Sequence, residues 1–426
     1  MHFKKMMLWF GFRLGCLLGL FLPFFAPSSY ASTLSLDAVN LTTVLREAVT
    51  QHPDIRSRRD DQQAAVDRLD AARWGRFPGL SAGVETRSGG LQSVLRLEQP
   101  VWNGGRISSQ IDASQADLGV AGATLSETQL DVLLRSAGAF FDILRLESRL
   151  KTALANEAEH LRLLETIQRR VAAEVSPLTD ETQAAARWRQ AITERIRTTQ
   201  QIDTARFLLA QLVGRPVAEL LPPTPINMGR WSESTLLDAA MRVSPERQRL
   251  VAQVDAAEAQ IGLAKSQIMP SVVAGYQFRL GTLPFGEDRG RAYLAVQVQT
   301  GGGLSSLANV RAAVSKKTAA VEAIEAHDRR LTQSVRTSWA ESLALKEQVE
   351  PVRNLLIGSE EIVASYLRQF QVGRKNWLDV LNAQREKAQA GYSFSDLEYP
   401  LMLSNVRLLL LAGRWDSTTL SLIHAP

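Results

Sequence analysis

Residues 243–279 read VSPERQRLVAQVDAAEAQIGLAKSQIMPSVVAGYQFR, and residues 51–87 read QHPDIRSRRDDQQAAVDRLDAARWGRFPGLSAGVETR. The two stretches align without a gap. In each, a helical pattern starts at a proline, ends at a second proline and continues as an alternating strand pattern. The chain therefore contains a duplicated unit. The aligned residues include Pro53 with Pro245, Ala64 with Ala256, Ala72 with Ala264, Pro78 with Pro270, Gly83 with Gly275 and Arg87 with Arg279.

The N-terminus has the features of a secretory signal peptide. Two lysines precede a long apolar run, and Ser29 and Ala31 occupy the small positions of a cleavage site. We expect cleavage after Ala31, which would remove residues 1–31. The alternative is a retained membrane anchor, which Arg13 inside the apolar run disfavours.

Composition limits the classes of function. The chain has 426 residues, a net charge of +5 and one cysteine, Cys16, which lies within the signal peptide. The mature chain would then have neither disulfides nor a thiol nucleophile. Loss of the signal peptide lowers the net charge to about +2, so the basic balance does not indicate nucleic-acid binding.

Two long proline-free or proline-poor stretches predict long helices. Residues 106–173 and 306–372 carry apolar residues at three- and four-residue spacing, which indicates a seam against partner helices. Each continues through a turn into a second, shorter helix, so helices are expected over about 106–213 and 306–413. A proline-rich linker, residues 215–231, separates the two halves.

Four strands are predicted, at about 80–101 and 272–299. One side of residues 272–280 carries Val272, Ala274, Tyr276, Phe278 and Leu280 and the other is mainly polar. Their length and alternation are typical of strands in a transmembrane barrel, although a half-exposed soluble sheet has the same period. Open strand edges are not tolerated in lipid, so several copies must combine their strands. Two copies give a barrel filled by side chains and three give an open lumen, so a pore favours three.

The sequence resembles the outer-membrane efflux proteins of the TolC type over essentially the whole mature chain. The similarity rests on the duplicated His-Pro and Ser-Pro helix starts together with four motifs in order. The motifs are EQPVWNGGR (98–106), AFFDIL (139–144), VRTSWAES (335–342) and YLRQFQVGRKNWLDVLNAQREKAQA (366–390). A further stretch, QTGGGLSSLANVRAA (299–313), departs from the usual pattern and is similar to members that serve type I secretion.

The resemblance implies a mainly α fold with a small β part, built from two tandem repeats. A homotrimer would form a 12-stranded transmembrane β-barrel continued by an α-helical coiled-coil barrel through the periplasm. The implied organisation is a signal peptide at 1–31, repeats at 32–214 and 232–414, the linker at 215–231 and a tail at 415–426. The implied function is an exit duct for type I protein secretion or drug efflux. Its implied partners are outer-membrane lipid, a periplasmic adaptor and an inner-membrane ABC or RND transporter.

The resemblance also implies a periplasmic gate at the two helix turns. Its closing residues correspond to Thr179, Asp180, Phe370, Lys375, Asp379 and Asn382. Three copies of Asp379 would form a ring able to bind cations, and Lys375 would pair with Asp180 of a neighbour. The alternative is that Thr179 and Asp180 only cap the following helix. The chain departs from the family at Phe370, Lys375, Asn382 and Glu174, where tyrosine, arginine, aspartate and glycine are usual.

Enzymatic functions find no support in the sequence. The histidines show no metal-ligand spacing, the glycine runs lack phosphate-loop register, and no nucleophile stands at a recognisable distance from a base. We therefore expect no enzyme activity, no cofactor and no resident metal. The alternative to a duct is a periplasmic helical adaptor or scaffold without a pore.

Overall fold

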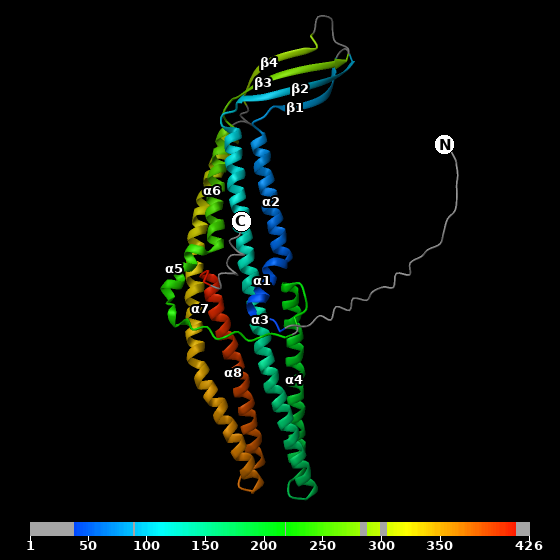
Figure 1. Cartoon of the computed structure of the whole chain (residues 1–426), viewed down its shortest axis with the longest axis vertical. Helices are drawn as coiled ribbons and strands as arrows, with labels where there is room; N and C mark the ends of the chain where they lie inside the picture. Colours follow the sequence, from blue (N-terminus) through cyan, green and yellow to red (C-terminus); the bar gives the residue numbers. More distant parts are fainter. Residues whose placement is uncertain (1–37, 88–89, 218, 282–287, 299–304, 415–426) are drawn as a thin grey trace, which may run out of the picture. The chain divides into compact units, whose positions relative to one another are not determined.

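The computed structural model describes residues 38–87, 90–217, 219–281, 288–298 and 305–414. The predicted signal peptide, the tail and residues 299–304 lie outside these ranges. The described elements occur twice in the same order: two helices, two strands and two further helices (Figure 1). They are α1 (Leu41–Gln51), α2 (Pro53–Trp74), β1 (Gly79–Arg87), β2 (Gly90–Trp102), α3 (Arg106–Ala172) and α4 (Leu178–Val213), then the 3₁₀ helix η1 (Met228–Arg230), α5 (Glu233–Val243), α6 (Pro245–Ser266), β3 (Ser271–Gly281), β4 (Gly290–Gln297), α7 (Ser305–Gln371) and α8 (Trp377–Leu411).

The two prolines that open the duplicated unit each begin a helix. In the first repeat, the His52 ring caps α2 by accepting a hydrogen bond from the Asp54 amide at 3.2 Å. In the second, the Ser244 hydroxyl caps α6 by accepting from the Arg247 amide at 3.2 Å. Proline is favoured directly after a cap because its missing N–H would have no helical partner. His52 therefore has a structural role.

The four strands form one antiparallel sheet in the order β1-β2-β3-β4, which joins the two repeats at the β2–β3 pair. Residues paired across the strands share a face, and the register separates an apolar face from a mainly polar one. This confirms the predicted alternation. The polar face holds an Arg96–Glu85 ion pair and a hydrogen bond from the Tyr293 hydroxyl to Glu98. The apolar face carries Leu80, Ala82, Val84, Leu95, Leu97, Tyr276, Phe278, Leu280, Leu294 and Val296.

Both outer strands of the sheet have an unpaired edge within the described residues. β1 pairs only with β2, and β4 pairs only with β3. The apolar face is also uncovered, since Leu294 is 70% exposed and Val296 is 67% exposed. A single chain therefore leaves both a hydrophobic face and two hydrogen-bonding edges unsatisfied.

The long helices α3 and α7 have 67 residues each, on the order of 100 Å at 1.5 Å per residue. The helix α3 packs against α2 and α6 and also against α4 and α8, while α7 packs against α6, α8 and α5. The largest hydrophobic cluster surrounds Phe140 and Phe141, which α1, α4 and α8 help to bury. Among the described residues, no helix is both long enough and apolar enough to cross a membrane.

The second helical hairpin contains prolines that the first lacks. Pro351 lies inside α7 and Pro400 inside α8. Each removes one helical hydrogen bond, and such positions are where helices bend. The hairpin is held on both sides of this level by a Ser342–Asn405 hydrogen bond of 2.7 Å and a Lys387–Glu360 ion pair of 3.6 Å.

Candidate functional site

The two helix turns have the same backbone conformation. Residues 173–177 join α3 to α4, and residues 372–376 join α7 to α8. Glu174 has φ = 59° and Gly373 has φ = 74°, and they occupy corresponding positions. In each turn the next amide donates back across the helix end, from Val175 to the Arg170 carbonyl at 2.9 Å and from Arg374 to the Gln369 carbonyl at 2.9 Å. Both turns thus end a helix with a left-handed residue.

Replacement of Glu174 by glycine should stabilise the first turn. Glu174 is the one non-glycine residue with positive φ among the described residues. The left-handed conformation costs an L-residue about 1–2 kcal/mol, which glycine avoids. Glycine also makes the unfolded chain more flexible, and this offsets part of the stabilisation. We expect a net gain of roughly 0.5–1 kcal/mol, measured as slower amide exchange in residues 170–178.

The matched control is Gly373→Ala, which should speed exchange in the second turn because it introduces the same strain. Equal exchange in Glu174→Gly and wild type would show that the turn is not strained.

A hydrophobic cluster joins the two turns. Phe370, at the end of α7, is 7% exposed, and its ring centroid lies 5.5 Å from that of Trp377 at the start of α8. The Arg170 guanidinium of the first hairpin lies over the Phe370 ring, 4.7 Å from its centroid. The cluster also contains Leu163, Leu164, Ile167, Ala184, Val380 and Leu381. Phe370 therefore packs between the hairpins, where a tyrosine would also bring a hydroxyl.

Two of the candidate gate residues meet directly. The Lys375 ammonium lies 3.6 Å from the Asp379 carboxylate in the same turn, and 4.3 Å from the centroid of the Tyr366 ring. Both side chains are partly exposed. Within one chain, Lys375 therefore offsets the charge of Asp379.

The remaining gate residues stand apart from these contacts. Thr179 and Asn382 are exposed and Asp180 is partly buried. Within the described ranges, no side-chain hydrogen bond or ion pair joins Thr179, Asp180 or Asn382 to another candidate gate residue.

The capping alternative for Thr179 and Asp180 is wrong. The N-cap of α4 is Pro177, which makes no side-chain cap, and Thr179 and Asp180 already lie inside the first turn. There the Asp180 carboxylate interacts favourably with the positive end of the helix dipole.

Polar contacts further from the turns connect α3 to α8. The sequence motifs did not reveal them. Arg145 donates to Asp396 at 2.9 Å, and Arg149 pairs with the same carboxylate. Burial alone lowers the pKa of Arg145, but its hydrogen bonds to Asp142 and Asp396 raise that pKa above the ordinary value. Asn156 accepts from Gln384 at 3.1 Å. These residues fix the first hairpin against the second.

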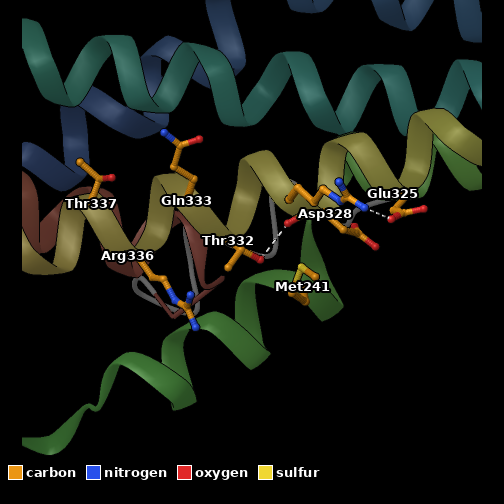
Figure 2. A pocket seen from close by; sticks show the side chains of 8 residues that line it. Met241, Glu325, Asp328, Thr332, Gln333, Arg336 and Thr337 are labelled. Atoms are coloured by element: carbon orange, nitrogen blue, oxygen red, sulfur yellow. Dashed lines mark hydrogen bonds and ion pairs between the residues drawn. The ribbon is translucent and has the colours of Figure 1, made fainter.

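A groove lies between α5 and α7 (Figure 2). It is shallow and open, with a volume of about 560 Å³, and is lined by Met241 of α5 and by α7 residues that include Glu325, Asp328 and Arg336. Glu325 pairs with Arg329, and Asp328 pairs with Arg247 at 3.1 Å. The groove thus lacks an unpaired carboxylate beside a nucleophile. Over the described ranges, no three His, Cys, Asp or Glu side chains gather as a metal site would require.

Comparison with known proteins gives the context for this geometry. The family model described as "Outer membrane efflux protein" matches residues 44–215 and 236–414. The chain is 27% identical to the cobalt-zinc-cadmium resistance protein CzcC of Cupriavidus metallidurans over 354 residues, covering 77% of this chain and 80% of that protein. It is 23% identical to the outer membrane protein TolC of Vibrio cholerae over 413 residues, covering 91% and 94% of the two chains.

A solved structure shows the same fold. The outer membrane protein VceC of Vibrio cholerae superposes with a TM-score of 0.75 at 19% identity, covering 88% of this chain and 96% of that chain. The family model spans well over half of the sequence, in two segments that each contain one strand hairpin and one long helical hairpin. The chain belongs to the outer membrane efflux protein family, and it is an outer-membrane export channel that extends into the periplasm.

Proposed function

We propose that three copies of this chain assemble into one duct. The observation that carries the proposal is the sheet with an uncovered apolar face and two unpaired edges, β1 and β4. Pairing β1 of one copy with β4 of the next satisfies every edge, and twelve strands leave an open lumen. The outer helices support the same arrangement, since Phe207 of α4 is 77% exposed and Leu355 of α7 is 60% exposed.

The assembly is tested by electrophoresis of outer-membrane fractions. We expect a band of three chain masses in unheated samples that becomes a single-chain band on boiling, because lipid-embedded barrels resist detergent until heated. A chain found only in the soluble periplasmic fraction as a monomer would favour the adaptor or scaffold instead.

We further propose that the duct works with a periplasmic adaptor and an inner-membrane ABC or RND transporter. A passive duct holds no energy source of its own, so a transporter must drive export. The names of the relatives refer to metal resistance in one case and, for the AprF protein of Pseudomonas aeruginosa, to alkaline protease secretion. We therefore propose a duct whose cargo is set by its transporter.

The periplasmic gate is proposed to lie at the two turns. Three symmetry-related copies of Asp379 would form an acidic ring, and Asp180 of one copy would face Lys375 of the next. The shared Phe370 cluster holds the two turns of each chain together. Since Lys375 already contacts Asp379 in its own turn, the same lysine would limit the charge of the ring.

Single-channel recording in planar bilayers tests this gate. Asp180→Ala combined with Lys375→Ala should raise conductance, because the contact between neighbouring copies is lost. Asp379→Ala should weaken block by divalent cations about tenfold, the effect of losing roughly 1.4 kcal/mol of attraction. Lys375→Ala alone should strengthen the block.

The control variant is Lys387→Ala, which removes a lysine of α8 that pairs with Glu360 away from the turn. Wild-type conductance in the double variant, with unchanged block in Asp379→Ala, would place the gate elsewhere.

A further inference from the structure

A polar groove lies between α4 and α8, above the turns. The helix α3 packs against both of these helices and runs between them (Figure 1). The groove encloses about 610 Å³, within the range of small-molecule sites of roughly 300–1,000 Å³. Four arginines line it, against one carboxylate, that of Glu194. The arginines are Arg149 of α3, Arg187 and Arg197 of α4 and Arg385 of α8.

Two of these arginines are already neutralised. Arg149 pairs with Asp396 and lies 3.4 Å from Glu194, and its guanidinium stacks over the Tyr392 ring, 4.7 Å from the centroid. Arg197 lies 3.6 Å from the same Glu194. These contacts account for Glu194, the one carboxylate among the lining residues, and for Asp396 beside Arg149.

The other two arginines are not neutralised. Arg187 donates to the Gln190 amide oxygen at 3.1 Å, a neutral partner. Within the part of the chain that the structure describes, neither Arg187 nor Arg385 has a carboxylate within 4.0 Å. One of them belongs to each wall, so the groove presents two uncompensated positive charges from two different helices.

The pKa of His160, on α3, is sensitive to the positive charge in this groove. His160 lines the groove, is buried, and its Nδ1 has no hydrogen-bond partner. Burial lowers the pKa of His160, and the charge of Arg187 lowers that pKa further. No carboxylate opposes this shift, which agrees with a local excess of positive charge.

We propose that this groove binds a small organic dianion, a ligand with two carboxylates or with a phosphate group. Guanidinium groups form paired hydrogen bonds with either oxyanion, so Arg187 and Arg385 match two negative charges. The volume leaves room for a carbon chain between two acidic groups. The bound dianion connects α4 of the first hairpin to α8 of the second and so opposes their separation.

Calorimetry on the purified full-length protein in detergent tests the site. Succinate, glutarate, adipate and inorganic phosphate are titrated at constant ionic strength, with acetate as the monoanion. We expect one saturable site per chain for at least one dianion, and at least tenfold weaker binding in Arg187→Gln and in Arg385→Gln. Arg189→Gln is the matched control, because Arg189 lies on α4 outside the groove and is exposed.

A second measurement follows the imidazole of His160 by NMR. Saturation with the bound dianion should shift its resonances and raise its pKa, because the anion offsets Arg187. Binding of phosphate alone would identify a phosphoryl ligand, and preference for one dicarboxylate length would identify a dicarboxylate.

The proposal is overturned if none of the dianions shows saturable binding. It is also overturned if Arg189→Gln weakens binding as much as Arg187→Gln, since the effect is then one of general charge. Should Arg187→Gln disturb trimer assembly, Arg187→Lys keeps the charge and removes the guanidinium fork. Unchanged dianion affinity in Arg187→Lys and Arg385→Gln, with normal assembly, likewise excludes the site.

Discussion

Arginine at Leu294 or Val296 should prevent assembly of the protein in the outer membrane. Both side chains lie on the apolar face of β4 and are at least two-thirds exposed in the single chain. An arginine facing lipid costs roughly 2–4 kcal/mol at the bilayer midplane, and each trimer carries the change three times. The measurement is the amount of heat-modifiable trimer in outer-membrane fractions, which should fall to a small fraction of wild type.

Ala295→Arg provides the matched control on the same strand. Ala295 pairs with Val273 and points to the opposite, mainly polar face, so its arginine would enter the lumen. We expect near-normal trimer from this variant. Equal assembly of the Leu294, Val296 and Ala295 variants would contradict the assignment of the apolar face to lipid.

Phe370→Ala should loosen both helix turns at once. The side chain is almost fully buried, and it contacts Trp377 of its own hairpin and Arg170 of the other. Truncation of a buried phenylalanine costs about 3–5 kcal/mol, because apolar contacts are lost and a cavity remains. Amide exchange should therefore accelerate in residues 163–184 and 363–384, with higher single-channel conductance if these turns close the duct.

Leu378→Ala separates this effect from general damage to the turn. Leu378 follows Trp377 but is 45% exposed, so its loss should change exchange little. Faster exchange confined to α7 and α8 in Phe370→Ala would show that the cluster does not couple the hairpins.

Much of the fold could be predicted because the prolines that begin helices recur at matching positions in the two repeats. Pro53 and Pro245 mark helix starts, and the alternation in residues 272–280 identifies the apolar side of a strand. The short helices α1 and α5 did not emerge as separate elements. A single capping residue, His52 or Ser244, divides each from the next helix, so the apolar pattern alone does not show the break.

The candidate site was less predictable because its contacts join distant segments. The unusual Glu174 was recognisable, since its turn resembles one that ends in glycine elsewhere in the family. The contact of Arg145 with Asp396 spans 251 residues and leaves no local spacing to detect. The burial of Phe370 likewise depends on Arg170 and Ile167, which belong to the other hairpin.

The order of the sheet makes its assembly depend on both halves of the chain. Its central pair, β2 with β3, joins residues from opposite halves, and Tyr293 bonds to Glu98 across 195 residues. The first strand hairpin therefore lies well before its partner strands in the chain and cannot form the central pair without the second half. Such non-local pairing is slow, and strands whose edges are still unpaired are prone to aggregate. The β1–β2 hairpin should then depend on a holding chaperone until the second half has been delivered, whereas the helices of the first half can pair at once.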